Sequence, residues 1–397
     1  MIDKNDFSLI IKTHAGLEQI LADEVTAAGG HEVQLLVRAV RCQADTATMY
    51  RINYTCRTAL RVLQLIKSFE VNNENELYNE IYKLDWPEIF PVDGTFAINA
   101  KVSRSEMTHD QYVALKAKDA VVDKFRELLG SRPNVDTIDP DMRIHIHISG
   151  SQGMLLLDSS GDSLHKRGYR RGQGLAPINE VLAAGMVLLS GWDATIDLLD
   201  PMCGTGTILC EAAMVAQKMP SGYFRKKFGF MSWPDYQPEL WKEILETENA
   251  RIQPAQCRLY GADVNQRVLA QADEVIQNTG FDKIIILKQV AFENGSPPTD
   301  KPGMIITNPP YGERIEKTNL NDFYRMIGDV LKNKYAGYTA WLITSDFGAL
   351  KSVGLRTSRK ITLFNGPLEC RYVQYQMYSG SKKVKEEDRD EKGEVRN

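Results

Sequence analysis

Residues 200–207 read Asp-Pro-Met-Cys-Gly-Thr-Gly-Thr and join two segments of different periodicity. The segment before them, Ile196 to Asp200, is a short apolar run that ends in an acid. The segment after them, Ile208 to Gln217, has apolar residues at helical spacing. A strand, a tight turn with two glycines and a helix form the usual entry to a nucleotide-binding domain. From about Gly161 onward strand and helix patterns alternate, which predicts a mostly parallel sheet and an α/β Rossmann-like fold.

The two glycines of this turn suit a cofactor that carries no phosphate groups. The dinucleotide pattern requires a third glycine, and Leu209 occupies that position, while the lysine of a P-loop is also missing from the turn. The aminoacyl end of a cofactor can cross Gly204 and Gly206, with Asp200 placed to meet its ammonium group. Asp263, which follows the run 257–262, would bind a ribose diol. A Gly-x-Gly turn also fits a purely structural loop, so that alternative stays open.

The second chemical motif is Asn308-Pro309-Pro310-Tyr311, which follows a short buried strand pattern at Met304–Thr307. The amide oxygen of Asn308 and the carbonyl of Pro309 can each accept one N–H of a planar amine, which frees the nitrogen lone pair. The two prolines stiffen the turn and remove backbone donors. Tyr311 offers a flat face on which an extruded base can stack. With the glycine turn, this motif predicts methyl transfer from S-adenosylmethionine to an exocyclic amine, a reaction that depends mainly on positioning.

The insertion Lys218 to Pro254 lies between the glycine turn and Asp263, and it interleaves cations with aromatic residues. This composition suits a polyanion whose bases stack, and it fits equally a helical cap whose aromatic residues form a core. A second basic cluster at 166–171 fits either the mouth of an active site or a solvated linker. The cations predicted to contact such a polyanion are Lys166, Arg167, Arg170, Arg171, Arg225, Lys226 and Lys227.

The composition sets outer limits on the kind of protein. The chain has 397 residues, enough for two or three domains, and its 43% hydrophobic and 25% charged content is ordinary for a soluble protein. No stretch approaches the roughly 20 apolar residues that span a membrane. The six cysteines form no C-x-x-C pair, which predicts reduced thiols in a cytoplasmic protein and no metal site. The net charge of −4 means that any RNA surface must be local.

The first 160 residues have an α+β pattern. Phe7 to Lys12 predicts a strand, and the following apolar spacing predicts an amphipathic helix. A helix is expected near Thr58 to Ile66, and Tyr112 to Leu129 predicts a long amphipathic helix. Arg143 to Ser149 alternates strictly, which predicts a half-exposed strand rather than a histidine metal site. The domain boundary is expected between residues 160 and 170.

In these motifs the chain resembles the THUMP-domain guanine-N2 RNA methyltransferases, most closely the bacterial enzymes that modify large-subunit ribosomal RNA. The resemblance covers nearly everything up to about residue 380. It also runs through motifs outside the two already described. These are Thr13-His14-Ala15-Gly16-Leu17-Glu18, residues 118–123, Leu156-Leu157-Asp158, residues 164–170 and Phe230-Met231-Ser232-Trp233-Pro234.

The resemblance implies a ferredoxin-like region at 1–55 and a THUMP RNA-binding domain at 56–160. It implies a methyltransferase domain at 161–380, with a seven-stranded, mostly parallel sheet that has one antiparallel strand near the end, and the charged residues 381–397 are expected to form a disordered tail. S-adenosylmethionine is the implied cofactor and RNA, most of all 23S ribosomal RNA, the implied partner. The implied cofactor-binding residues are Asp200, Cys203, Gly204, Thr205, Gly206, Asp263 and Asn265, and the implied catalytic residues are Asn308, Pro309, Pro310 and Tyr311.

One position departs from the family. An acid that holds the adenine amine is expected after the next strand, and Ala291 stands there, so a backbone N–H and packing by Phe292 would have to serve. Other functions remain open at this stage. They are tRNA guanine-N2 methylation, methylation of adenine N6 in DNA or of glutamine in protein, and a catalytically silent RNA-binding assembly factor. Some family members carry a second methyltransferase domain, so a chain with one such domain is expected to modify one RNA position. The oligomeric state stays open.

Overall fold

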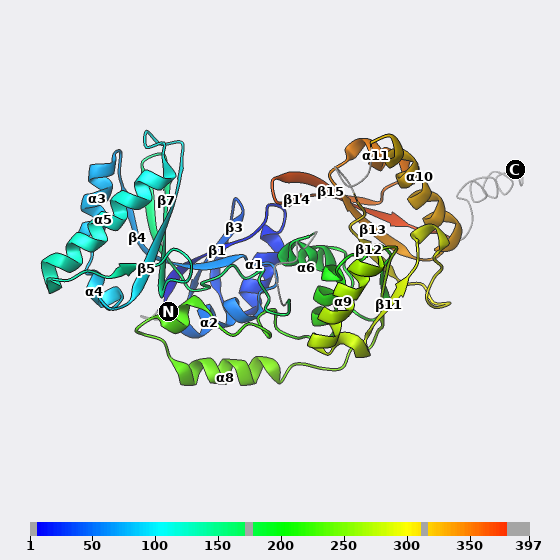
Figure 1. Ribbon diagram of the computed structural model, residues 1–397, viewed down its shortest axis with the longest axis horizontal. Coiled ribbons are helices and arrows are strands. Elements are labelled where there is room, and N and C mark those ends of the chain that lie inside the picture. Colours follow the sequence, from blue (N-terminus) through cyan, green and yellow to red (C-terminus); the bar gives the residue numbers. More distant parts are fainter. Residues whose placement is uncertain (1–5, 171–177, 311–316, 379–397) are drawn as a thin grey trace, which may run out of the picture. The chain divides into compact units, whose positions relative to one another are not determined.

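The computed structural model describes residues 6–170, 178–310 and 317–378 (Figure 1). The chain forms two compact units, each with its own sheet. The N-terminal unit comprises Met1–Tyr169 and Met219–Ile252, and the C-terminal unit comprises Arg170–Lys218 and Gln253–Asn397. The expected methyltransferase domain at 161–380 is therefore interrupted, because the insertion packs with the N-terminal unit rather than with the residues that flank it in sequence.

The N-terminal unit contains an eight-stranded sheet in the order β2-β3-β1-β4-β8-β7-β5-β6. Its strands are β1 (Phe7–Lys12), β2 (His31–Leu36), β3 (Ala39–Ala44), β4 (Arg61–Glu70), β5 (Thr95–Ser103), β6 (Asn134–Val135), β7 (Met142–Ser149) and β8 (Gln152–Asp158). Strand β5 runs parallel to β6 and β7, and the other pairs are antiparallel. Its helices are α1 (Glu18–Ala27), α2 (Thr46–Thr55), α3 (Glu74–Tyr82), α4 (Trp86–Ile89), α5 (Asp110–Leu129) and α8 (Pro238–Asn249), with a 3-10 turn η1 (Gly229–Ser232).

Strand β4 corrects the expectation of a helix near Thr58 to Ile66. The apolar run at its start fits a strand as well as a helix over so short a window. Its central place decides between them, because β1 pairs with one edge of β4 and β8 with the other. The sheet therefore continues across the expected boundary between 1–55 and 56–160, because β4 pairs with β1 of the first region and with β8 of the second.

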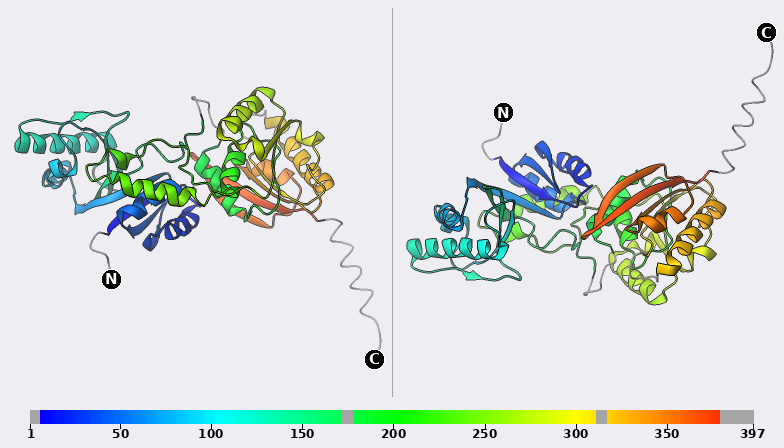
Figure 2. Two further views of the ribbon diagram at one scale, coloured as in Figure 1. Left: turned by 90° about the horizontal axis from the view of Figure 1, so that it is seen from below. Right: turned by 90° about the horizontal axis from the view of Figure 1, so that it is seen from above.

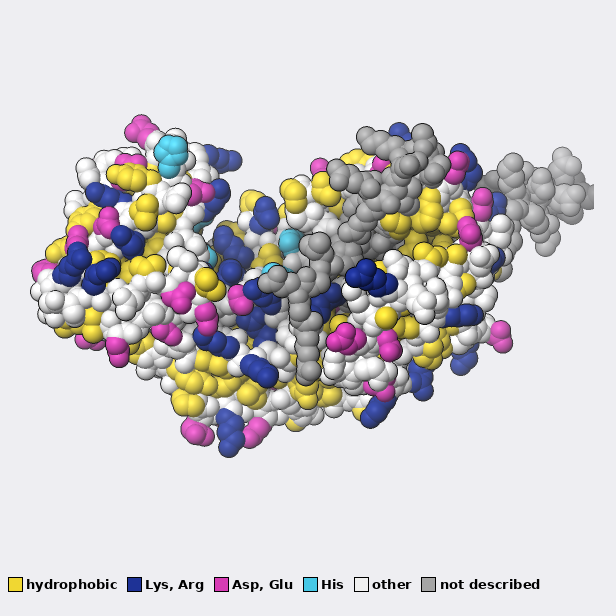
Figure 3. All heavy atoms as spheres, in the orientation of Figure 1, with side chains coloured by type: hydrophobic (Ala, Val, Ile, Leu, Met, Phe, Trp, Pro, Cys, Tyr) yellow, Lys and Arg dark blue, Asp and Glu magenta, His cyan; other side chains and the backbone are white. Residues whose placement is uncertain are grey.

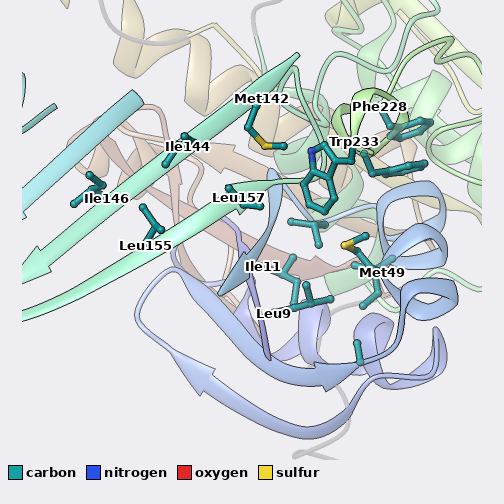
Figure 4. Close-up of a cluster of buried hydrophobic side chains, with 14 of the residues drawn as sticks. Leu9, Ile11, Met49, Met142, Ile144, Ile146, Leu155, Leu157, Phe228 and Trp233 are labelled. Atoms are coloured by element: carbon teal, nitrogen blue, oxygen red, sulfur yellow. The ribbon is translucent and has the colours of Figure 1, made fainter. Parts of the chain in front are cut away.

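The insertion contributes to the core of the N-terminal unit. Figure 4 shows Phe228 and Trp233 beside Met49 of α2 and Leu157 of β8. The Phe230 ring stacks on Tyr50 with centroids 4.1 Å apart, and such aromatic pairs contribute roughly 0.5–1.5 kcal/mol beyond burial. The structure thus favours the second interpretation of this insertion, in which its aromatic residues form a core rather than stack on bases.

The C-terminal unit contains a seven-stranded sheet in the order β11-β10-β9-β12-β13-β15-β14. The strands are β9 (Leu198–Asp200), β10 (Leu259–Asp263), β11 (Ile285–Gln289), β12 (Met304–Thr307), β13 (Thr339–Thr344), β14 (Arg359–Asn365) and β15 (Leu368–Gln376). Strand β15 is antiparallel to β13 and β14, and the remaining pairs are parallel. The expected single antiparallel strand near the end of the sheet is confirmed.

Helices cover both faces of this sheet (Figures 1 and 2). They are α6 (Glu180–Leu189), α7 (Thr207–Ala216), α9 (Gln266–Thr279), α10 (Lys317–Lys334) and α11 (Phe347–Ser352), with 3-10 turns η2 (Phe281–Lys283) and η3 (Phe292–Asn294). One face packs against α10 and α11 through residues such as Ile305 and Leu342. On the α6 side, the hydroxyl of Tyr372 in β15 donates to the carbonyl of Met186 at 2.9 Å.

Two general features concern the chain as a whole. All six cysteines are buried free thiols. No helix within the described ranges is long and apolar enough to cross a membrane. Figure 3 shows both acidic and basic side chains on the face that it presents.

Candidate active site

Three strand ends build the site. Strand β9 lies between β10 and β12, and all three run parallel. Their carboxyl ends therefore meet at one edge of the sheet, where open α/β sheets bind ligands. Asp200 ends β9, Asp263 ends β10, and Asn308 follows β12. The topology brings together three side chains that the sequence alone placed far apart.

The glycine turn takes the conformation that its sequence requires. Gly204 has φ 53° and Gly206 has φ 75°, in the left-handed region that side chains disfavour. The amide of Cys203 donates to the carbonyl of Ala262 at 2.8 Å, which ties the turn to the end of β10. A β-carbon at Gly206 would lie 3.4 Å from that of Ala272 in α9. The turn thus holds its backbone against the neighbouring strand and helix, and leaves its outer side to the cavity described below.

Asp263 holds the turn and retains free acceptor positions. Its Oδ2 accepts the amide of Gly204 at 3.0 Å, and its Oδ1 accepts the amide of Asn265 at 2.9 Å. An ionised carboxylate has about four acceptor positions, so these two bonds leave others for a diol. Asn265 caps α9, because its side chain accepts from the amides of Arg267 and Val268.

Asp200 is buried between β9 and β12. Its Oδ1 accepts the hydroxyl of Thr307 at 2.8 Å and the amide of Met202 at 3.3 Å. Burial raises the pKa of Asp200 to about 7, the charge of Asp263 adds to this shift, and the two hydrogen bonds oppose it. A cationic group bound nearby would favour the ionised carboxylate.

Asn308 stands out at the end of β12. Its Oδ1 is buried and accepts no hydrogen bond from any residue in the described ranges. Buried polar atoms without partners are rare in folded proteins, so each one calls for a physical reason. An N–H donor of a bound ligand would satisfy this oxygen. Pro309 is buried, Pro310 is partly exposed, and the predicted stacking residue Tyr311 lies outside the described residues.

A cavity of about 710 Å³ connects these groups. Its size is typical of ligand and cofactor sites. The sequence-predicted residues that line it are Asp200, Cys203, Gly204, Thr205, Asp263, Asn265, Asn308 and Pro310. Gly206 and Pro309 support the lining from adjacent positions in the chain. The structure thus brings the predicted cofactor and catalytic residues to a single cavity, as far as it describes them.

One side of the cavity is apolar. Val264, Ala291, Phe292, Phe323 and Met326 line it. Phe292 is held in place by Tyr335, whose ring centroid lies 5.7 Å away. Ala291 has no carboxylate that could hold an adenine amine. The apolar side chains around it can pack against a flat base instead. Glu293 also lines the cavity.

Sequence reasoning missed several residues that line or support the cavity, among them Thr307, Phe323 and Met326. Thr307, which bonds Asp200, directly precedes the Asn-Pro-Pro-Tyr motif, so its place at a strand end was a usable signal. Phe323 and Met326 stand three residues apart on α10, a spacing that places them on one helix face. That spacing is equally typical of core residues, so the sequence could not separate them from the buried face.

The two basic clusters contain side chains of two kinds. Arg167 is buried, and it donates to the carbonyls of Leu164 and Arg57, which gives this side chain a structural role, and its phosphate contact stays a prediction. Arg225 donates to the carbonyls of Ser160, Asp162, Ser163, Lys166 and Lys227. It too organises the backbone.

The remaining predicted cations differ in exposure. Lys166, Lys226 and Lys227 are exposed, with Lys166 paired to Asp162 and Lys227 to Asp139. Arg170 is bonded to the glycine turn and Glu180. Arg171 lies outside the described residues. Among the lysines of these clusters, Lys226 has the fewest described polar contacts, and it is the simplest candidate for a phosphate.

Three consecutive segments of the chain match known domain families. Residues 8–63 match the RlmL ferredoxin-like domain, residues 71–158 match the THUMP domain, and residues 167–374 match the RMKL-like methyltransferase domain. The last match spans more than half of the chain. The matched ranges agree with the order of regions expected from the sequence.

Individual proteins are similar over nearly the whole chain. The "Putative RNA methyltransferase" of Synechocystis sp. is 37% identical over 365 residues, covering 91% of this chain and 95% of that protein. The ribosomal RNA large subunit methyltransferase K/L of Desulfotalea psychrophila is 38% identical over 378 residues, covering 93% of this chain and 52% of that protein. The chain therefore spans about half the length of the K/L relatives it matches. A solved structure, "a putative methyltransferase complexed with SAH", aligns with TM-score 0.85 and 26% identity, covering 96% of this chain and all of that one.

Proposed function

Because the chain belongs to the RMKL-like methyltransferase family, we propose that it methylates the exocyclic N2 amine of a guanine in RNA, with 23S ribosomal RNA as the favoured substrate and S-adenosylmethionine as methyl donor. Family membership confirms the resemblance and the fold class expected from the sequence. The K/L relatives are named for large-subunit ribosomal RNA, and the THUMP match supports an RNA substrate. Work on ribosomal RNA would place the protein in the cytoplasm.

The observation that carries the proposal is the buried Oδ1 of Asn308, which has no partner among the described residues and lines the same cavity as Asp200 and Asp263. An acceptor held at a strand end can bind one N–H of a planar amine. The carbonyl of Pro309 is the second acceptor in this proposal. With both N–H groups held, the nitrogen lone pair is directed out of conjugation with the ring.

The reaction follows from this arrangement. When bound, S-adenosylmethionine would supply a methyl group on a positively charged sulfur. The amine nitrogen held by Asn308 and Pro309 would form the new N–C bond, the electron pair of the broken S–C bond would stay on the sulfur of S-adenosylhomocysteine, and the nitrogen would release its extra proton to solvent. Asp263 uses its remaining acceptor positions to hold the ribose diol of the cofactor. Asp200 supplies negative charge near the turn. The chain's main contribution is to fix two reactants in line, which is worth roughly 7–11 kcal/mol in well-oriented systems.

A direct assay tests the proposal. The purified chain would be incubated with S-adenosylmethionine carrying a labelled methyl group and with protein-free 23S ribosomal RNA, and the RNA would then be digested to nucleosides for mass analysis. We expect label in N2-methylguanosine. Label in N6-methyladenosine would contradict the choice of amine. Transfer RNA and partly assembled large-subunit particles, offered in parallel, would show whether the RNA class is right, and label confined to transfer RNA would overturn the ribosomal assignment.

A further inference from the structure

Arg170 makes a set of contacts that an RNA-binding cation does not need. Its Nη1 donates to the hydroxyl of Thr205 at 3.1 Å, and its Nη2 donates to the hydroxyl of Thr207. Its Nε lies 3.2 Å from Oε1 of Glu180, in the first turn of α6. The Arg170 and Glu180 side chains are only 18% and 8% exposed. The guanidinium therefore ties the glycine turn to α6 from a largely buried position.

The direction of these hydrogen bonds sets the role of the two hydroxyls. A guanidinium can only donate, whereas a threonine hydroxyl has one O–H to donate and lone pairs to accept. With a lone pair of each oxygen engaged by Arg170, the O–H of each threonine is available as a donor. Neither hydroxyl donates to another residue in the described ranges. Both Thr205 and Thr207 line the 710 Å³ cavity.

The start of α7 and the cation of Arg170 are the two features that favour an anion beside these hydroxyls. Helix α7 begins at Thr207, and its N-cap residue Gly206 has no side chain to accept from the amides of the first turn. A helix N-terminus carries partial positive charge, and the cation of Arg170 adds to it. The carboxylate of Glu180, 3.2 Å from Nε of Arg170, and the buried carboxylate of Glu211 offset part of that charge. Two hydroxyl donors in a positive field suit a carboxylate better than an ammonium group.

We propose that Arg170 is a positioning residue that orients the hydroxyls of Thr205 and Thr207 to donate to the carboxylate of the cofactor's aminoacyl end. This inference rests on the proposed function, because it takes the cavity to be the cofactor site. It assigns opposite charges to neighbouring parts of the glycine turn, with acidic Asp200 serving the ammonium and the Arg170-backed threonines serving the carboxylate. It also gives Arg170 a role other than the RNA phosphate contact expected from the sequence.

The test compares two ligands that differ only in the carboxylate. Calorimetry would measure the binding of S-adenosylhomocysteine and of its decarboxylated analogue to the full chain and to its Arg170→Ala variant. For Arg170→Ala we expect the affinity for S-adenosylhomocysteine to fall about tenfold or more, as for the loss of hydrogen bonds to a charged group. The affinity for the decarboxylated analogue should change by less than about twofold, since that ligand has no carboxylate to lose contact with.

Further variants separate positioning from general damage. Arg170→Lys keeps the charge without the planar fork and should fall between the parent and Arg170→Ala. Thr205→Val and Thr207→Val remove one hydroxyl each and should reproduce the carboxylate-selective loss even if Arg170→Ala folds poorly. Arg325→Ala removes an exposed arginine of α10 that pairs with Asp322 and does not line the cavity, and it should leave both affinities unchanged.

Three results would overturn the inference. If Arg170→Ala, Thr205→Val and Thr207→Val each lost as much affinity for the decarboxylated analogue as for S-adenosylhomocysteine, the role of Arg170 would be structural alone. An unchanged affinity for S-adenosylhomocysteine in Arg170→Ala, together with weaker RNA binding, would restore the phosphate contact. If the parent chain failed to bind S-adenosylhomocysteine at all, the proposed function would fail first, and that outcome is visible before any variant is made.

Discussion

The cavity of the C-terminal unit has two ends that are prepared in different ways. At the glycine turn, Asp263 already accepts two backbone amides and Asp200 accepts a hydroxyl and an amide. At the end of β12, the side-chain oxygen of Asn308 is buried and has no partner among the described residues. The acids of the glycine turn are already hydrogen-bonded before any ligand binds. The side-chain oxygen of Asn308 still has an acceptor position for a ligand.

This difference suggests a division of labour. A turn that is already held by hydrogen bonds loses little conformational freedom when a ligand binds, so its contacts can contribute fully to affinity. An unsatisfied acceptor raises the free energy of the unliganded site and regains it only when the right donor arrives. Interactions made mainly on the way to the transition state raise turnover rather than affinity. Cofactor affinity should therefore depend on the glycine turn, and turnover should depend on Asn308.

The strongest test of this division is Asn308→Ala. We expect turnover to fall about a hundredfold or more, the scale seen when one preorganised hydrogen bond to a reacting group is removed. The dissociation constant of S-adenosylhomocysteine should stay within about twofold of the parent value, because the lost acceptor serves the RNA amine. Single-turnover methylation and calorimetry measure the two quantities.

The control for this variant is Asn294→Ala, which removes an exposed asparagine of η3 near the same cavity. It should leave both turnover and affinity unchanged. A large loss of cofactor affinity in Asn308→Ala would contradict the division, since it would place Asn308 on the cofactor side.

Asp200 offers a pH-dependent test at the glycine turn. Its pKa in the folded chain is raised to about 7, above the usual value, mainly by burial. Between about pH 4 and pH 7 the folded chain therefore holds a proton that the unfolded chain releases, so this group makes stability fall as pH rises. Relative to Asp200→Asn, which does not titrate, the free energy of unfolding of the parent should drop by about 2 kcal/mol between pH 5 and pH 8.

Urea unfolding of both proteins at the two pH values measures this difference. Saturating S-adenosylhomocysteine should shrink the drop, because its ammonium group favours the ionised carboxylate. A parent and a variant that lose stability in parallel from pH 5 to pH 8 would show that Asp200 is ionised throughout.

Asp263→Ala tests the same end at a smaller scale. Its loss removes the proposed ribose contact and also releases the amide of Gly204 from the turn. We expect the dissociation constant of S-adenosylhomocysteine to rise about tenfold, the size expected for one charge-assisted hydrogen bond. Turnover at saturating cofactor should fall by less than the affinity does. Asp263→Asn keeps one acceptor oxygen, so its dissociation constant for S-adenosylhomocysteine should lie between those of the parent and Asp263→Ala. An unchanged dissociation constant in both variants would remove Asp263 from the cofactor site.

The sequence predicted the residues of both ends better than it predicted what supports them. Local patterns sufficed to place Asp200, Asp263 and Asn308 at one edge of the sheet, because each stands at the end of a short apolar strand and parallel strands align their carboxyl ends. The number of strands and the antiparallel strand near the end of the sheet came from the family resemblance, and the order of the strands came from the structure. The apolar spacing of the short run at Thr58 to Ile66 fitted a helix and a strand equally well. The structure shows strand β4 there, in the middle of the sheet. The environments of Arg167, Arg170 and Arg225 could not be predicted, since a buried arginine and an exposed one look alike in a sequence, and the long-range carbonyl and hydroxyl partners that separate them are fixed by tertiary contacts.

The smallest predicted effect lies outside both ends of the cavity, at Lys226 in the insertion. Its side chain is exposed, and the insertion packs with the N-terminal unit that contains the THUMP match. If Lys226 contacts one RNA phosphate, Lys226→Ala should raise the KM for RNA by about twofold to threefold and lower the salt dependence of RNA binding by about one phosphate. Lys242→Ala, an exposed lysine of α8 in the same insertion, is the matched control and should change neither. Cofactor affinity should stay constant in both variants, because Lys226 and Lys242 belong to the N-terminal unit. Filter binding at several salt concentrations measures RNA affinity, and calorimetry measures cofactor affinity. A change in cofactor affinity in Lys226→Ala would contradict a role limited to RNA binding.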